Sequence, residues 1–139
     1  MLKDVYNKYK LIYKNYIILI RNGNFYLALN DDSIVLNNIF KFKIIELKNF
    51  IKCGFPLDSI YKVTDTLDDL NINYLIYDNN ITHKKKYTTN NYLKYINKSN
   101  YILLKKIDNI NNILKLNINS THINNIINDI EGILCKIDC

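Results

Sequence analysis

The chain has 139 residues, enough for one domain with a hydrophobic core and too few for a multidomain enzyme. Hydrophobic residues make up 48% of it and charged residues 23%, which is typical of a globular protein and excludes a largely disordered one. The formal net charge of +6 permits attraction to a polyanion without establishing it.

The first third of the chain predicts a helix followed by a β-hairpin and a second helix. Apolar residues recur at helical spacing over residues 2–15, and residues 16–21 form a β-branched strand. Asn22-Gly23 is a favoured hairpin turn, so residues 24–29 are expected to be the second arm. The second helix carries Ile34, Leu36, Ile39 and Phe40, and its N-cap is expected from Asp31, Asp32 and Ser33.

The middle of the chain predicts two further strands, a third helix and a last strand. The strands cover residues 43–47 and 49–53, and Gly54-Phe55-Pro56 is expected to end the second of them. Pro56 suits the first turn of a helix over residues 57–71. A strand follows at residues 74–78. This order predicts an α/β fold, a mixed sheet flanked by helices.

The last third of the chain predicts a polar segment and then a helical hairpin. Residues 79–91 are read as an exposed loop or an edge strand. Apolar residues at helical spacing predict a helix over residues 92–114, and Ser120 is expected to cap a final isoleucine-rich helix. These isoleucines must pack on each other, on the α/β domain or on a second chain, and packing within the chain is the favoured alternative. The expected organisation is therefore 1–78, 79–91 and 92–139.

No segment predicts secretion, a membrane span or a metal site. Residues 17–20 are the longest clean apolar run, far below the roughly 20 residues that cross a bilayer. The cysteines lack a C-x-x-C pair, and neither histidine lies in a metal motif. We therefore expect a cytoplasmic protein with reduced thiols and without metal or cofactor. The residues concerned are Cys53, Cys135, Cys139, His83 and His122.

The sequence also lacks the motifs of common enzymes. Three glycines cannot build a P-loop, and there is no nucleophile elbow or H-E-x-x-H motif. The carboxylates of Asp31-Asp32 and of Asp65, Asp68 and Asp69 are explained by helix caps and solvated faces. No enzymatic function is expected.

Gly23-Asn24-Phe25-Tyr26 is the segment best suited to contact a partner. Glycine accepts a positive φ angle, so the turn can present Phe25 outward as a wedge of the kind that enters DNA base steps. From spacing alone, however, a strand residue facing the core is the favoured interpretation of Phe25.

Two separated motifs in this order resemble the N-terminal mismatch-recognition domain (domain I) of the DNA mismatch-repair protein MutS. That domain has an apolar strand, then Gly-Asp-Phe-Tyr-Glu, then a helix opened by acidic residues, and later Ala-Gly-Ile-Pro-Tyr-His-Ala-Val. The resemblance covers about residues 6–78, and residues 79–139 look like the helical extension of small stand-alone proteins that carry only this domain. The matching segments are Ile17-Ile18-Leu19-Ile20-Arg21-Asn22-Gly23-Asn24-Phe25-Tyr26, with Tyr9-Lys10 before and Asp31-Asp32 after it, and Cys53-Gly54-Phe55-Pro56-Leu57-Asp58-Ser59-Ile60.

The resemblance implies that Phe25 stacks on a mispaired base. It places Gly23, Asn24 and Tyr26 in the supporting loop, and a turn at Gly54, Phe55 and Pro56 near the DNA backbone. At Leu27 the family has a glutamate that hydrogen-bonds the mispaired base, which leucine cannot do. Further candidates for phosphate contact are Arg21, Lys84, Lys85 and Lys86. For the three lysines the alternative interpretation, a solvated surface, is favoured.

Three functions are compatible with these features. The leading hypothesis is a non-enzymatic module that binds double-stranded DNA at a mismatch or bulge. The alternative is a protein-interaction or regulatory module that keeps the fold without DNA, with its C-terminal helices docking a protein partner or forming a homodimer. A third is a small phage or mobile-element protein that mimics the repair domain, which the Asn-, Ile- and Lys-rich composition allows.

Overall fold

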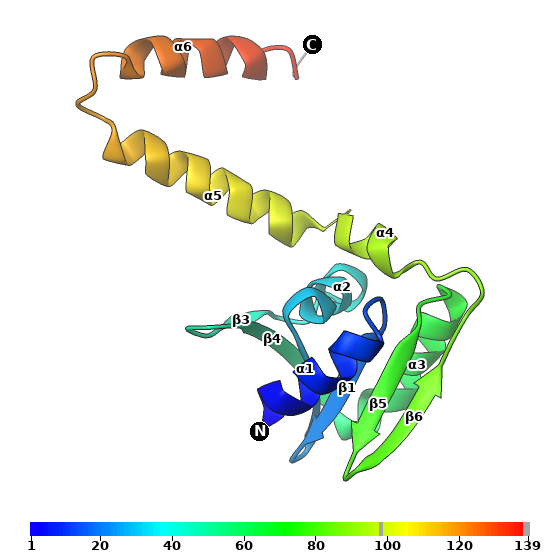
Figure 1. Cartoon of the computed structure of the whole chain (residues 1–139). Helices are drawn as coiled ribbons and strands as arrows, with labels where there is room; N and C mark the ends of the chain where they lie inside the picture. Colours follow the sequence, from blue (N-terminus) through cyan, green and yellow to red (C-terminus); the bar gives the residue numbers. More distant parts are fainter. Residues whose placement is uncertain (98, 138–139) are drawn as a thin grey trace. The chain divides into compact units, whose positions relative to one another are not determined.

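The structure, a computed structural model, describes residues 1–97 and 99–137. The chain divides into two compact units, Met1–Tyr101 and Ile102–Cys139, and each is considered by itself (Figure 1). None of the helices in the described residues combines the length and the apolar character that a transmembrane helix requires.

The first unit is built on a six-stranded mixed sheet in the order β3-β4-β2-β1-β5-β6. Its neighbouring strands run antiparallel except for β1 and β5, which are parallel. The strands are β1 (Ile17–Asn22), β2 (Phe25–Leu29), β3 (Ile45–Glu46), β4 (Ile51–Pro56), β5 (Tyr74–Asp78) and β6 (Ile81–Lys85). The helices are α1 (Leu2–Ile12), α2 (Asn30–Phe40), the 3₁₀ turn η1 (Leu57–Ser59), α3 (Ile60–Asp69) and α4 (Tyr92–Asn97). The predicted mixed α/β fold is confirmed.

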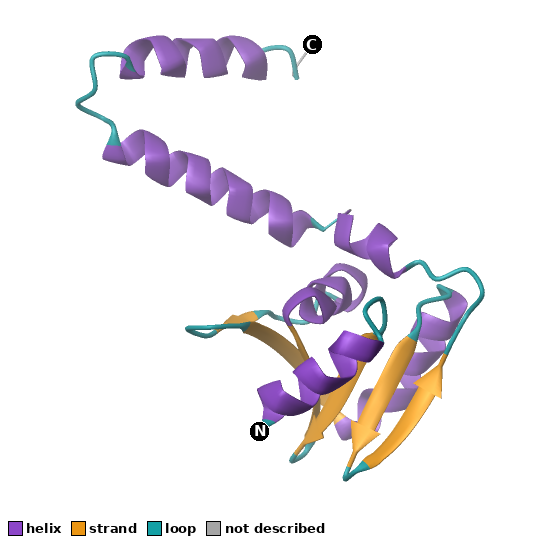
Figure 2. Ribbon diagram, in the orientation of Figure 1, coloured by secondary structure: helices purple, strands orange, loops and turns teal. Residues whose placement is uncertain are grey.

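Helices cover both faces of the sheet, because its central strands are apolar on both sides. Side chains alternate between the two faces along a strand. Ile18 and Ile20 of β1 pack with Tyr6 of α1 in one cluster, whereas Ile17 and Leu19 belong to a second cluster with residues of α2, α3 and α4. Figure 2 shows α1 and α3 on opposite sides of the strands. The apolar run of residues 17–20 in β1 is therefore the signature of a strand buried on both faces.

Several predicted boundaries are wrong, and the strand predicted over residues 43–47 shortens to Ile45–Glu46. Helix α1 ends at Ile12, and β4 continues through Gly54 and Phe55 to Pro56 instead of ending before them. The helix predicted over residues 92–114 is instead two helices, α4 and a second one that begins at Asn100. For residues 79–91 the edge-strand interpretation is confirmed, because β6 lies at the outer edge of the sheet.

Two further helices, α5 (Asn100–Leu116) and α6 (Ile123–Leu134), follow as predicted. Ser120 is not the N-cap of α6, since that position belongs to His122, and the Ser120 hydroxyl instead accepts a hydrogen bond from the His122 backbone N–H at 3.3 Å. In α6, Ile123 is 8% exposed, but most of the other large aliphatic side chains of α5 and α6 are exposed. Large aliphatic side chains such as Ile110 and Ile133 are 52% and 62% exposed.

Candidate nucleic-acid interface

The β1–β2 hairpin presents Phe25 at its tip. Asn22 pairs with Phe25, so the turn consists of Gly23 and Asn24, and Gly23 has a φ angle of +62°. A side chain at this φ would be strained, which glycine avoids. The Asn24 carbonyl accepts a hydrogen bond from the Leu57 backbone N–H at 3.1 Å, which ties the turn to the start of η1. The tip is therefore a constrained turn.

Phe25 and Tyr26 point to opposite faces, as successive strand residues must. Phe25 is 49% exposed, so the prediction that it faces the core is wrong. Tyr26 is 7% exposed, packs 5.8 Å from the ring of Phe55 and donates a hydrogen bond from its hydroxyl to Asp78 at 3.1 Å. Burial raises the pKa of the Tyr26 hydroxyl, and the hydrogen bond to Asp78 adds to the shift. Tyr26 thus anchors the strand whose first residue, Phe25, faces solvent.

Beside Phe25 lies a hollow of about 340 Å³ whose lining includes Phe25, Leu27, Phe42 and Ile45 together with Lys43 and Lys52. Gly54 pairs with Leu27 across the β2–β4 ladder and leaves room for the leucine side chain. A Cβ atom at Gly54 would lie 2.5 Å from Leu27 Cδ2 and 2.9 Å from the Tyr26 carbonyl oxygen. The hollow is therefore an apolar surface with two cationic side chains at its border.

Gly54, Phe55 and Pro56 form a strand and not the expected turn. Phe55 is 1% exposed and stacks on Phe42 at 5.5 Å, so its ring belongs to the core and cannot contact a partner. Pro56 is exposed and pairs directly with Phe25. A second hollow, of about 350 Å³, is lined by Asn24, Phe25, Pro56, Leu57 and Asp58.

Arg21 lies close to the hairpin tip, but its charge is partly compensated. Its guanidinium approaches the Asp78 carboxylate at 3.3 Å, and both side chains are about one-third exposed, at 37% and 32%. The Arg21 Nε–H group also donates to the Gly23 carbonyl at 3.5 Å. An exposed pair of this kind exchanges readily with water, so a phosphate would have to compete with Asp78 for Arg21.

The run of Lys84, Lys85 and Lys86 does not share a surface with Phe25. Lys85 pairs with Tyr74 at one end of β5, whereas Arg21 and Asp78, next to Phe25, mark the other end. Three strand spacings across the sheet and about five residues along the strands separate Lys85 from Phe25, which corresponds to a distance of about 20 Å. Lys84 and Lys85 instead lie over the rings of Tyr13 and Tyr87, at 5.1 and 5.9 Å.

Two other lysines, Lys43 and Lys52, line the hollow that Phe25 also lines. The sequence pattern did not single them out, because they are nine residues apart in a lysine-rich chain. Their proximity follows from the pairing of Lys52 with Leu29 and with Ile45, that is, from the β2–β4–β3 register. From the sequence, Lys43 and Lys52 could have been identified as neighbours only if this pairing of the strands had been assumed.

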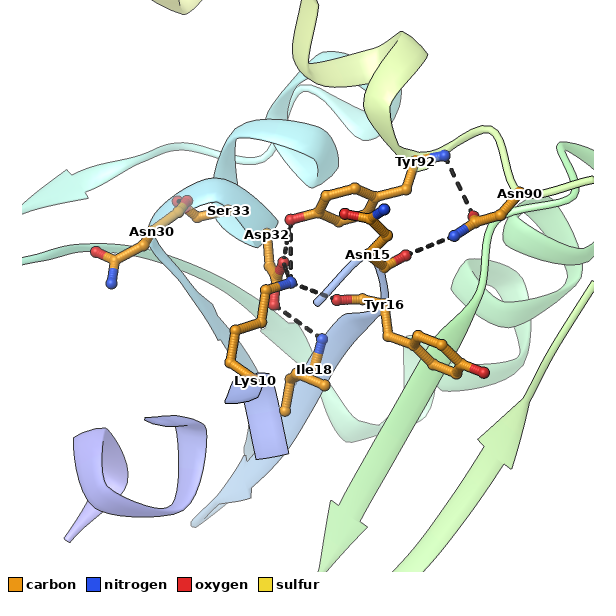
Figure 3. Close-up of polar contacts among 9 residues, drawn as sticks. All are labelled: Lys10, Asn15, Tyr16, Ile18, Asn30, Asp32, Ser33, Asn90 and Tyr92. Atoms are coloured by element: carbon orange, nitrogen blue, oxygen red, sulfur yellow. Dashed lines mark hydrogen bonds and ion pairs between the residues drawn. The ribbon is translucent and has the colours of Figure 1, made fainter. Parts of the chain in front are cut away.

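Asp32 is fully buried and is not the predicted N-cap of α2. Its Oδ1 atom accepts hydrogen bonds from Lys10 Nζ and from the Tyr92 hydroxyl, each at 2.5 Å, and its Oδ2 atom accepts the Ile18 backbone N–H at 3.0 Å (Figure 3). Lys10 Nζ also donates to the Tyr16 carbonyl at 2.6 Å. One carboxylate therefore joins α1, β1, α2 and α4, and we interpret it as a structural clamp.

The buried hydroxyls and thiol predict loss of stability at alkaline pH. Burial is the largest cause that raises the pKa of Tyr92 and of Tyr6, and Asp32 adds to both shifts. Burial also raises the pKa of Cys53 from 9.0 to about 12. The unfolded chain loses these protons first, so the stability that they contribute is complete below pH about 9 and falls progressively as the pH rises above it.

Urea unfolding from neutral pH to about 11 checks this expectation, together with the near-ultraviolet absorbance of tyrosinate. The unfolding midpoint should fall as the pH rises above about 9, and Tyr6 and Tyr92 should ionise only as the chain unfolds. A midpoint that stays constant up to pH about 11 would contradict it.

No group of three His, Cys, Asp or Glu side chains suited to a metal ion occurs among the described residues. Cys53 is buried and Cys135 is exposed, while Cys139 lies outside the described residues. Neither a scan against models of known protein families nor a search of curated protein sequences finds a match to this chain.

Proposed function

We propose that this chain is a non-enzymatic DNA-binding module that acts inside the cell and inserts Phe25 at mispaired or bulged positions of a duplex. The observation that carries the proposal is the 49% exposed phenyl ring at a hairpin tip whose backbone is fixed by Gly23 and by the Asn24–Leu57 hydrogen bond. A wedge must be held rigidly, because it has to unstack two base pairs at a cost of a few kcal/mol.

The surroundings of Phe25 supply the other parts of such an interface. Leu27 and the hollow beside it offer apolar surface to an unstacked base, and Lys43 and Lys52 at its border offer charge to the flanking phosphates. The net charge of +6 favours the approach to DNA. Asp58, which lines the neighbouring hollow, disfavours phosphate on that side and so orients the duplex toward the lysines.

The motifs similar to the MutS mismatch-recognition domain support the same assignment. Leu27 stands where that family has a glutamate, so no carboxylate is available there to read the mispaired base. Aromatic stacking is tolerant of base identity. The proposal is therefore that the protein recognises deformable or unpaired sites in general, with weak discrimination among individual mismatches.

Binding of matched, G·T-mismatched and single-base-bulged duplexes at several salt concentrations tests the proposal. We expect the bulged duplex to bind best. Phe25→Ala should weaken that binding about 5- to 150-fold, because a stacked base contributes ~1 to 3 kcal/mol. Tyr61→Ala is the matched control, since Tyr61 is another aromatic residue, 79% exposed, on α3. Binding that Phe25→Ala leaves unchanged would refute the wedge.

Lysine variants locate the phosphate contacts in the same assay. The double variant Lys43→Ala/Lys52→Ala should reduce the slope of log K against log salt by about two, because each phosphate contact contributes a slope of about one. Lys84→Ala/Lys85→Ala removes the same charge from β6 and should change the slope much less. Equal effects of the two pairs would indicate nonspecific attraction.

A protein-interaction module that keeps the fold without DNA is the second candidate. The exposed aliphatic side chains of α5 and α6 favour it, as does the absence of the glutamate at Leu27. If none of the three duplexes binds in a salt-dependent way, the DNA-binding proposal is refuted and the protein-interaction module is favoured.

A further inference from the structure

The second unit carries an apolar stripe along each of its helices. In α6 the apolar residues recur at intervals of three and four, which places them on one face of a helix. In α5 a row with the same intervals is flanked by two further apolar residues. The α6 residues are Ile123, Ile126, Ile127, Ile130, Ile133 and Leu134, and the α5 residues are Leu103, Ile107, Ile110 and Leu114 with Leu104 and Ile113 beside them.

Most of this stripe is exposed. Ile107 and Ile110 of α5 are each 52% exposed, and Ile126 and Leu134 of α6 are 46% and 52% exposed. Contiguous apolar patches of more than a few hundred Å² are rare on monomeric soluble proteins and mark interaction sites. Isolated helices of this length are also marginal in water and draw their stability from a packed face.

The two helices carry opposite charges, which indicates what covers the stripes. Helix α5 has three lysines, Lys105, Lys106 and Lys115, and one aspartate, whereas α6 has Asp129 and Glu131 and no basic residue. Two copies of α5 side by side would repel each other, as would two copies of α6. Pairing of α5 with α6 is favoured, since charges beside a helical seam select its partner.

The width of the apolar faces calls for more than one such pair. A seam between two helices covers only two rows per helix, whereas Ile126 and Ile133 form a third row on α6, and Leu104 and Ile113 lie beside the seam of α5. Faces of this width are typical of helices in bundles. We propose that a second copy of this chain covers them, so that two α5 and two α6 helices form a four-helix core in which each α5 packs against the α6 of the other copy.

Light scattering and sedimentation of the full chain test the proposal. The expected mass is twice the 16.5 kDa of one chain. Ile126→Gln/Ile133→Gln changes only the third row and should return the mass to that of one chain. Asn125→Gln/Asn128→Gln, on the polar face of the same helix, is the matched control and should leave the dimer intact. A wild-type chain that stays monomeric at high concentration overturns the proposal.

Charge exchange tests the pairing of unlike helices between copies. Lys106→Glu/Lys115→Glu makes α5 acidic, and Asp129→Lys/Glu131→Lys makes α6 basic, so each variant alone should be monomeric. An equimolar mixture should form a heterodimer, because every acidic helix then finds a basic one in the other chain. Circular dichroism shows whether each variant keeps its helices. Folded variants that dimerise alone, or that stay monomeric when mixed, overturn the α5–α6 pairing.

Discussion

Replacement of Asp32 by leucine should destabilise the protein by about 3–5 kcal/mol, the usual cost of removing one partner of a buried ion pair. The Lys10 ammonium loses its counter-ion, and the Ile18 N–H and the Tyr92 hydroxyl lose their acceptor in a place that water does not reach. Urea unfolding at neutral pH, followed by circular dichroism, measures the change in the free energy of unfolding.

Asp31→Leu is the matched control for this prediction. Asp31 is the exposed neighbour of Asp32 on the same helix, and its replacement should change the free energy of unfolding by less than about 0.5 kcal/mol. The double variant Lys10→Met/Asp32→Leu should recover part of the loss, because no unpaired charge then remains near the core. An Asp32→Leu variant within about 1 kcal/mol of the wild type would show that the clamp contributes little.

Phe55→Ala should also destabilise the protein by about 3–5 kcal/mol, the cost of removing a large aromatic side chain from a core. Phe55 is 1% exposed and lies between Phe42 and Tyr26, at 5.5 and 5.8 Å. Phe25→Ala, in the paired strand, should cost much less, because nearly half of that ring is already in water. Urea unfolding of the two variants under identical conditions gives the comparison.

Comparison of Phe25→Ala with Phe55→Ala distinguishes a residue of the core from a residue that contacts a partner in the paired strands β2 and β4. If Phe25→Ala destabilises as much as Phe55→Ala, Phe25 is part of the core and a loss of DNA binding would only report unfolding. If Phe25→Ala is stable and Phe55→Ala is not, the DNA experiments can be interpreted as effects on contact. The stability measurement therefore precedes the binding measurement.

Several features of the two units were predictable from local pattern. The Asn22-Gly23-Asn24 segment predicted the hairpin between β1 and β2, and the apolar run of residues 17–20 predicted a strand. Helical periodicity predicted α1, α3 and the C-terminal helices. These signals are short-range, because turn chemistry and side-chain periodicity act over a few residues.

The candidate site was only partly predictable. The aromatic residue at the turn was identified from sequence, but its direction was not, since alternation along β2 leaves the choice of face to the packing. Lys43 and Lys52 gave no local signal, and the run of Lys84 to Lys86 drew attention to the wrong end of the sheet. Asp32 was interpreted as a helix cap because its partners, Lys10 and Tyr92, lie 22 and 60 residues away in the sequence.

The sequence by itself therefore determined most of the elements of this protein: a glycine turn, an apolar strand, helices and the apolar stripes of the C-terminal helices. The tertiary structure decided which side chains meet. Tyr26 and Phe55 turn inward and leave Phe25 at the surface, the β2–β4–β3 register brings Lys43 and Lys52 to the hollow that Phe25 also lines, and the buried carboxylate of Asp32 joins four elements. The physical reason is that strand pairing and burial act between residues far apart in the chain, whereas turns and periodicity are local.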